Sequence, residues 1–298
     1  MATDFTTKPK DTPTSNQGIR FELGQGGLPK LKIDTEWSSA EIYLQGAHVT
    51  HFQLMGQPPL LFLSHASRFE PGQAIRGGIP IILPWFGSRE GMAAHGCARN
   101  RTWDIREVSI VPDGWAIRFG LECPMVPGFA PFRADYLVTV GQALGLELVV
   151  TNQSSQQGLT FENCLHTYFQ VGDITNTSVL GLKGVSYLDK VAAFTQKVET
   201  SDVIRISSET DRVYFDTRSS VEIVDPILRR KIVVEKQNSD STVVWNPWIS
   251  KAQQMADFGN EEFRRMICVE SGNVAPNRIT LPPGGSQSLK VRLTCAGL

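Results

Sequence analysis

Several marks of common protein classes are missing from this sequence. The five cysteines include no Cys-x-x-Cys pair, so we expect neither a zinc site nor a disulfide framework, but free thiols in a reducing cytoplasm. Lys and Arg number 29 against 30 Asp and Glu, which argues against a nucleic-acid-binding protein. The densest apolar run, Ile79–Phe86, contains two prolines and is too short to span a bilayer, and residues 1–20 lack the apolar core of a signal peptide. We therefore expect a cytoplasmic protein that binds neither nucleic acid nor membranes.

Alternation of apolar and polar residues with a period of two dominates the chain. It runs through Tyr136–Val140 and resumes after a glycine-flanked turn in Leu146–Thr151, which predicts a β-hairpin. Leu289–Cys295 alternates in the same way, as a half-exposed strand does. Helical patterns are short and confined to Ser250–Phe258 and Glu261–Arg265.

Many short strands separated by turns predict an all-β fold, a large antiparallel sandwich or barrel with a few short helices. The 26 glycines and 17 prolines supply the turns, and the 41% of hydrophobic residues can fill a full core. No linker or repeat interrupts residues 19–298, so we expect one domain there. Residues 1–18 are poor in aromatic residues and predict a flexible leader.

Four segments break the strand-and-turn pattern, and such departures tend to mark functional sites. In the first, Arg76 precedes two glycines, where its guanidinium offers a planar fork to an anionic oxygen group. A structural salt bridge explains this arginine equally well. In the second, His95 precedes a glycine and lies four residues before Arg99, which is typical of a polar pocket.

The third and fourth segments contain a histidine and a carboxylate in apolar surroundings. Burial of His166 would lower its pKa and prepare it for proton transfer near neutral pH, while a hydrogen-bonded core histidine is the plainer alternative. Glu270 follows the apolar run Met266–Val269, where a carboxylate is costly unless it is hydrogen-bonded or functional. Trp245 and Trp248 either offer an apolar face to a sugar ring or fill the core.

Taken together, these motifs resemble those of the glucose-6-phosphate 1-epimerases, a branch of the aldose 1-epimerase superfamily. The matching motifs are AIRGGIP (74–80), PWFG (84–87), HGCAR (95–99), LHTYF (165–169), ETDRVY (209–214), VWNPW (244–248) and CVE (268–270). They occur in the family's order. The resemblance implies a galactose-mutarotase-like β-supersandwich. It also implies an isomerase that interconverts the α and β anomers of a hexose 6-phosphate, above all glucose 6-phosphate, with no cofactor and no metal.

The resemblance also implies roles for individual residues. His166 falls on the family's proton donor to the ring oxygen, and Glu270 falls on the base at the anomeric hydroxyl. Arg76, Arg99 and Asp211 fall on residues that contact the substrate, and arginines suit its phosphate.

Two further residues of the matching motifs, His95 and Trp248, are expected in the same substrate site. Two other positions depart from the family. Ala94 stands where the family usually has a glutamine that contacts the substrate, and Cys97 stands where it usually has phenylalanine. The acid and the base are unaffected, but the preferred sugar or phosphate stays open.

Two alternative functions are weaker. A non-catalytic sugar-phosphate-binding or regulatory protein of the same fold would be expected to lose His166 or Glu270, and both are present. A glycoside hydrolase would use a carboxylate pair such as Asp211 and Glu270, but one acid and one base fit ring opening better. The sequence has no Gly-rich phosphate loop and no metal-ligand motif. The expected partner is a small hexose phosphate, and we expect the enzyme to be a monomer.

Overall fold

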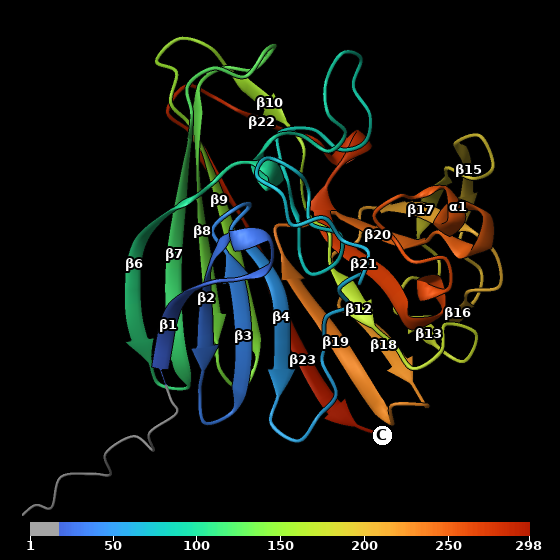
Figure 1. Cartoon of the computed structure of the whole chain (residues 1–298). Coiled ribbons are helices and arrows are strands. Elements are labelled where there is room, and N and C mark those ends of the chain that lie inside the picture. Colours follow the sequence, from blue (N-terminus) through green and yellow to red (C-terminus); the bar gives the residue numbers. More distant parts are fainter. Residues whose placement is uncertain (1–17) are drawn as a thin grey trace, which may run out of the picture.

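The computed structural model describes residues 18–298, in which 23 strands pair into four antiparallel sheets (Figure 1). The predicted leader, residues 1–18, lies outside the described residues except for Gly18, which begins the first strand. Two sheets are small. One consists of β1 (Gly18–Leu23), β2 (Pro29–Asp34), β3 (Ser38–Tyr43) and β4 (His48–Leu54). The other consists of β10 (Leu159–Phe161) and β22 (Ile279–Leu281).

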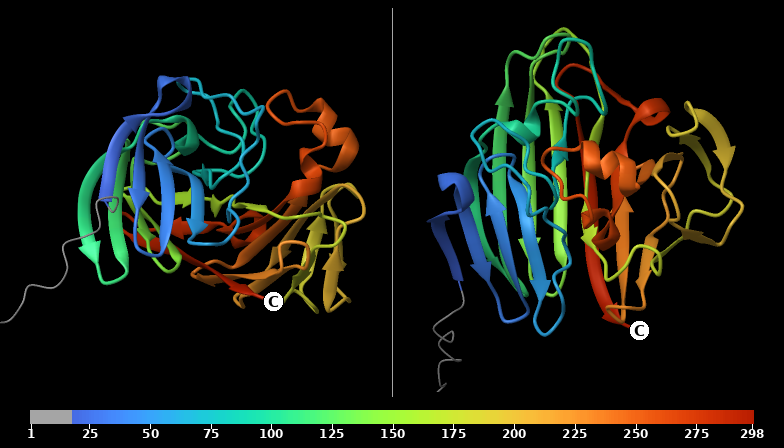
Figure 2. Two further views of the ribbon diagram at one scale, coloured as in Figure 1. Left: turned by 60° about the horizontal axis from the view of Figure 1, so that its bottom comes forward. Right: turned by 45° about the vertical axis from the view of Figure 1, so that its right-hand side comes forward.

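The largest sheet has nine strands. They are β6 (Asp104–Val111), β7 (Gly114–Cys123), β8 (Phe132–Val140), β9 (Leu144–Asn152), β13 (Ser178–Leu180), β16 (Val203–Arg205), β18 (Val221–Asp225), β19 (Arg230–Gln237) and β23 (Ser286–Gly297), in the order β16-β13-β18-β19-β23-β9-β8-β7-β6. The predicted hairpin is confirmed as β8 and β9, which meet at the pair Val140 and Leu144. Alternate residues of both strands are buried because one face of the sheet packs against β1–β4, the blue strands that lie over the green ones in Figure 2.

The eight-stranded sheet carries the residues of greatest functional interest. Its strands are β5 (Ile81–Ile82), β11 (Asn163–Leu165), β12 (Tyr168–Gln170), β14 (Ser186–Asp189), β15 (Thr195–Val198), β17 (Thr210–Phe215), β20 (Ser241–Asn246) and β21 (Met266–Asn273). All eight residues of β21 are buried. One edge of β21 pairs with β20, and the other pairs first with β12 and then with β11. The two residues between β11 and β12 therefore lie beside the middle of β21.

The helices are few and short, as the sequence predicts. They are α1 (Trp248–Gln254) and the 3-10 turns η1 (Gln25–Gly27), η2 (Ala98–Asn100), η3 (Glu262–Arg265) and η4 (Ala275–Asn277). The helix predicted over Ser250–Phe258 begins two residues earlier, where the Asn246 side chain accepts a hydrogen bond from the Trp248 backbone N–H. It also ends earlier, because Met255 is extended. Within the described residues, no helix is long and apolar enough to cross a membrane.

Candidate active site

Six of the seven residues predicted for the site line one cavity of about 640 Å³. They are Arg76, His95, Arg99, His166, Asp211 and Glu270. Trp248 is not part of this lining, because its ring packs against Phe263 with 5.2 Å between the ring centroids. Trp245, three residues earlier in the same motif, lines the cavity instead. The volume lies within the range of small-molecule sites.

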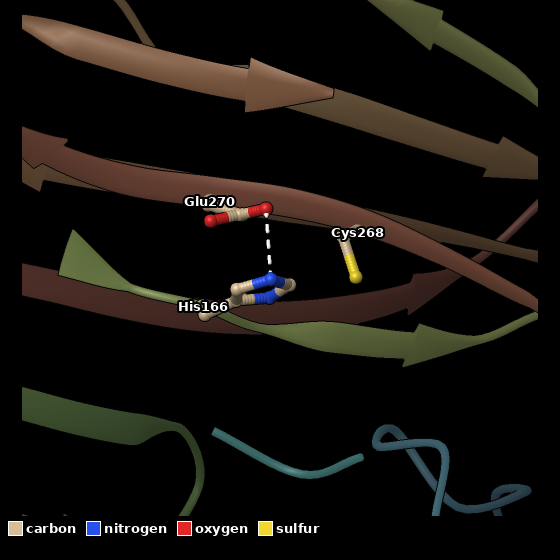
Figure 3. A group of neighbouring side chains, drawn as sticks. All are labelled: His166, Cys268 and Glu270. Atoms are coloured by element: carbon tan, nitrogen blue, oxygen red, sulfur yellow. Dashed lines mark ion pairs between the residues drawn. The ribbon is translucent and has the colours of Figure 1, made fainter. Parts of the chain in front are cut away.

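His166 and Glu270 form an acid–base pair in direct contact. His166 Nε2 lies 3.3 Å from Glu270 Oε1, and Figure 3 shows the carboxylate pointing from β21 toward the imidazole ring. His166 occupies the break between β11 and β12, where its backbone N–H donates to the Pro80 carbonyl at 3.1 Å. Since β11 and β12 both pair with β21, the sheet itself brings the two side chains together.

Burial disfavours the charged form of each member of this pair. Glu270 is 1% exposed, and burial, with a smaller contribution from the Asp211 charge, raises the pKa of its carboxyl well above the usual value. Burial also lowers the pKa of His166 well below its usual value, and His95 and the two arginines act in the same direction. Over a broad pH range the pair therefore shares one acidic proton, which can sit on the carboxylate or on the imidazole.

Aromatic rings surround the imidazole of His166. The Tyr168 ring lies parallel to it, with 4.7 Å between the centroids and 9° between the planes. His95 and Trp245 approach it edge-on, at centroid distances of 5.8 and 6.1 Å. The ring atom Nδ1 of His166 is buried and has no hydrogen-bond partner among the residues from Gly18 onward. These rings fix the plane of the imidazole and limit the access of water to the pair.

Arg76 is a paired arginine. Its Nε and Nη2 donate to Asp257 Oδ2 at 3.1 and 3.0 Å, and its Nη1 donates to the Tyr168 hydroxyl at 3.0 Å. Burial opposes its charge, but Tyr168 and Asp257 outweigh burial, and the pKa of Arg76 is raised. The salt bridge expected from the sequence is therefore present, and Arg76 also lines the cavity, while its contact with an anionic group stays a prediction.

Arg99 is an unpaired arginine. Its Nη2 donates to the Ala94 carbonyl at 2.8 Å, its Nε is buried without a partner, and no carboxylate among residues 18–298 lies within ion-pair distance of it. Burial, and then repulsion from Arg76, lowers its pKa to about 10, so it is still charged at neutral pH. A buried guanidinium with no counter-charge among the described residues has the chemistry to bind an anion.

His95 is held in a left-handed backbone conformation, with φ of 66°. Its Nδ1 accepts a hydrogen bond from the Gly87 backbone N–H at 3.3 Å, which assigns the proton of the neutral ring to Nε2. Burial and the Arg99 charge lower the pKa of His95 to about 3, so the ring is neutral at pH 7. It can therefore donate a hydrogen bond without adding charge.

Asp211 has a partner that the sequence did not reveal. Lys190 Nζ lies 2.7 Å from Asp211 Oδ2, and the Lys190 backbone N–H donates to the Asp211 carbonyl at 2.9 Å. Burial raises the pKa of Asp211, and Lys190 counteracts this effect. The ammonium also lies 5.5 Å from the centroid of the Phe86 ring. Lys190 belongs to no motif, and only the strand pairing of β14 with β17 places it here.

One group of neighbouring residues in the described part of the chain could bind a metal ion. The side-chain donor atoms of His166, Cys268 and Glu270 lie within 4.8 Å of one another, and Figure 3 shows Cys268 and Glu270 on the same face of β21. Nitrogen, sulfur and oxygen are all ligands that Zn²⁺ accepts. That the protein uses no metal stays a prediction.

A second cavity, of about 910 Å³, is larger but does not contain the acid–base pair. It contains none of the predicted site residues. Its buried lysine, Lys236, donates to the Thr217 and Thr242 hydroxyls and to the Ser241 carbonyl, so the ammonium is already satisfied. The acid–base pair makes the smaller cavity the candidate active site.

Known proteins match this chain in sequence and in structure over most of its length. The family model described as aldose 1-epimerase matches residues 29–294. A protein from Cenchrus ciliaris named "Putative glucose-6-phosphate 1-epimerase" is 37% identical over 256 residues, which cover 82% of this chain and 78% of that protein. One of the same name from Escherichia coli (strain K12) is 34% identical over 249 residues, covering 82% and 83%. The crystal structure of a "putative mutarotase" from Salmonella typhimurium matches with a TM-score of 0.86 at 28% identity and covers 94% of each chain, which confirms the predicted all-β fold.

Proposed function

The chain belongs to the aldose 1-epimerase family, and on this premise we propose that it interconverts the α and β anomers of a hexose 6-phosphate, with glucose 6-phosphate as the first candidate. One observation carries the proposal: a single cavity contains both a buried acid–base pair and an arginine with no acidic partner among residues 18–298. The pair suits a reaction at a sugar carbon, and the arginine suits a phosphate. The names of the curated relatives support the same substrate.

Exchange of anomers requires one proton to leave the O1 hydroxyl and another to reach the ring oxygen. In the proposed mechanism the Glu270 carboxylate removes the O1 proton while His166 Nε2–H protonates the ring oxygen. The bond between C1 and the ring oxygen breaks, and the O1 electrons form the aldehyde. Rotation about C1–C2 presents the other carbonyl face, and closure reverses both transfers. Each group contributes roughly 10²–10⁴-fold to the rate.

The number of protons on the pair does not change during this cycle. Ring opening converts a carboxylate and an imidazolium into a carboxylic acid and a neutral imidazole, and ring closure converts them back. Burial of His166 and Glu270 favours the two neutral forms and therefore the ring-opened half of the cycle. No proton needs to be exchanged with solvent, and no cofactor or metal is required.

The remaining lining residues supply substrate contacts. We assign the phosphate to Arg99 and Arg76, because charge-assisted contacts from arginine suit a phosphate. We assign the contacts with sugar hydroxyls to His95 and Asp211, which line the same cavity. Trp245 takes the sugar-facing role expected of Trp248, since only the former lines the cavity.

Compartment and assembly are part of the same proposal. The five cysteines are all free thiols, which suits a reducing cytoplasm. A cavity built from one chain needs no second copy, so a monomer is proposed.

The decisive experiment compares anomer exchange of glucose 6-phosphate and glucose at equal enzyme concentration. Exchange NMR or polarimetry should show acceleration above the uncatalysed rate for the phosphorylated sugar and far less for glucose. Tight binding of glucose 6-phosphate without acceleration would indicate a non-catalytic sugar-phosphate-binding protein. Cleavage of a glycosidic bond would indicate a hydrolase, and either result would overturn the proposal.

A further inference from the structure

Three buried side chains with different donor atoms meet beside the candidate active site. The donor atoms of His166, Cys268 and Glu270 all lie within 4.8 Å of one another, and the three residues are 7%, 0% and 1% exposed. Cys268 and Glu270 are two residues apart in β21, so their side chains lie on the same face of the sheet (Figure 3). His166 and Glu270 line the cavity and Cys268 does not, so the proposed mechanism gives the thiol no role.

The spacing of these atoms fits a zinc ion. Nitrogen and oxygen ligands bind Zn²⁺ at about 2.0–2.2 Å, so two of them at a tetrahedral angle are about 3.3 Å apart. His166 Nε2 and Glu270 Oε1 are 3.3 Å apart without any movement. A thiolate binds at about 2.3 Å, and with all three donors inside 4.8 Å the sulfur needs to move by no more than about 1 Å.

The charges of these ligands also suit zinc. A thiolate, a carboxylate and a neutral imidazole together carry two negative charges, which balance a buried dication. On binding, the thiol proton of Cys268 and the proton shared by His166 and Glu270 leave for the solvent. Mg²⁺ and Ca²⁺ prefer six or more oxygen ligands, and this group offers oxygen from only one side chain, Glu270. The donor set therefore selects zinc over these cations.

We propose that His166, Cys268 and Glu270 form an inhibitory zinc site, in which three protein ligands hold Zn²⁺ and the fourth position is left to water. Three protein ligands with one open position are an arrangement that zinc commonly adopts. The ion can enter through the cavity, because His166 and Glu270 both line it. Zinc binding itself does not depend on the proposed function.

Inhibition by the bound ion rests on the proposed function. A Glu270 carboxylate bound to zinc cannot accept the O1 proton, and a His166 ring bound to zinc cannot carry the proton for the ring oxygen. The same two side chains therefore serve either the reaction or the metal. Removal of zinc with EDTA should restore the full rate, because no covalent bond of the protein has changed.

Cys164 provides a matched control for Cys268. Both thiols are fully buried, and Cys164 Sγ lies 3.5 Å from Glu270 Oε2. Cys164 nevertheless does not belong to the group whose donor atoms come together. Substitution of either cysteine removes a thiol near Glu270, but only substitution of Cys268 removes a proposed ligand.

The first experiment measures metal binding without reference to activity. Full-length protein is titrated with Co²⁺, whose bond to a thiolate gives a charge-transfer absorption band in the near ultraviolet. We expect the band in the wild type and in Cys164→Ala, its loss in Cys268→Ala, and displacement of the cobalt by Zn²⁺, which binds such ligands more tightly. Thermal denaturation checks that each variant is folded, and Cys268→Val, which fills more of the thiol's volume, replaces Cys268→Ala if the latter unfolds.

The second experiment measures the Zn²⁺ concentration that halves the rate of anomer exchange of glucose 6-phosphate. Loss of an outer partner of a metal ligand already costs about 10–100-fold in affinity, so loss of the Cys268 ligand should raise this concentration by about 100-fold or more. Cys164→Ala should keep the wild-type sensitivity to zinc. Mg²⁺ at the same concentrations should leave the rate of the wild type unchanged.

The outcomes separate this proposal from the proposed function. The same cobalt spectrum in the wild type and in Cys268→Ala, or equal inhibition of both by zinc, would overturn the site. A spectrum that depends on Cys268, with an unchanged exchange rate at saturating zinc, would overturn the inhibitory role. Metal-free protein that never accelerates anomer exchange would overturn the proposed function, while the cobalt spectrum would still decide whether the metal site exists.

Discussion

The cavity contains two groups of side chains that differ in their charge state: one group is kept neutral by burial, and the other stays charged. At the acid–base pair, His166 and Glu270, burial favours the neutral form of both groups. At the arginines, the charge persists: Arg76 is balanced by Asp257, and Arg99 has no acidic partner in the part of the chain that the structure describes. The difference indicates which charges are neutralised within the protein and which are available to a ligand. A proton shuttle needs groups that can be neutral, whereas an anion site needs a charge that is always present.

The largest effect is expected at the acid–base pair. Glu270→Gln keeps the shape of the side chain but cannot accept the O1 proton, so kcat for glucose 6-phosphate should fall by about 10²–10⁴-fold. KM should change little, because the proposed phosphate contacts are untouched. Exchange NMR under saturating substrate measures the rate.

Glu199→Gln is the matched control for this variant. Glu199 is also a buried glutamate, but it bonds to Arg212 and Tyr214 outside the cavity. This change should lower thermal stability without a comparable loss of rate. A folded Glu270→Gln protein with wild-type kcat would remove Glu270 from the mechanism.

The second effect is expected at the unpaired arginine. Arg99→Ala removes a buried charge that no described carboxylate neutralises, and charge-assisted hydrogen bonds contribute about 1.5–3 kcal/mol each. KM for glucose 6-phosphate should therefore rise about 10–100-fold, while KM for glucose should change far less. Arg89→Ala is the control on the same loop, because Arg89 is exposed and packs against Phe129 outside the cavity. Equal effects of Arg99→Ala on both sugars would contradict the phosphate role.

The sequence predicted the strands better than it predicted the partners of the site residues. The alternation in Tyr136–Val140 is enough to predict the β8–β9 hairpin, because a period of two is a local property. The bond between Arg76 and Asp257 joins residues 181 positions apart, and no local pattern encodes it. Trp245 and Trp248 have the same residue type in one motif, but the chain turns into α1 between them, and only Trp245 faces the cavity.

The protonation state of His166 gives a direct test of the acid–base pair. A pKa below 6.5 means that the ring stays neutral as the pH falls through 6.5, where an ordinary histidine is half protonated. In ¹⁵N-histidine-labelled protein we expect the His166 signal to be unchanged between pH 8 and about 6. The His166→Gln variant identifies the signal by its loss, and the same sample in denaturant supplies the ordinary titration. A midpoint at or above 6.5 would show that the pair is an ion pair rather than a neutral pair.

The smallest effect is expected at Tyr168, which contacts both groups. Its ring stacks on His166, and its hydroxyl accepts a hydrogen bond from Arg76. Tyr168→Phe keeps the ring but removes the oxygen, so kcat should be nearly unchanged, and KM for glucose 6-phosphate should rise only a few-fold because Asp257 still holds Arg76. Tyr136→Phe is the matched control, since the buried Tyr136 hydroxyl has no hydrogen-bond partner in the described chain and its loss should leave both constants unchanged.

Either result at Tyr168 sharpens the comparison between the two groups. If kcat falls as much as in Glu270→Gln, the hydroxyl acts on the reacting proton, and the arginines and the acid–base pair are not separate units. If only KM changes, Tyr168 orients Arg76 through its oxygen and His166 through its ring, and the two contacts act independently. The structure favours the second outcome, because the hydroxyl bonds to Arg76 and the stacked face of the ring carries no proton donor.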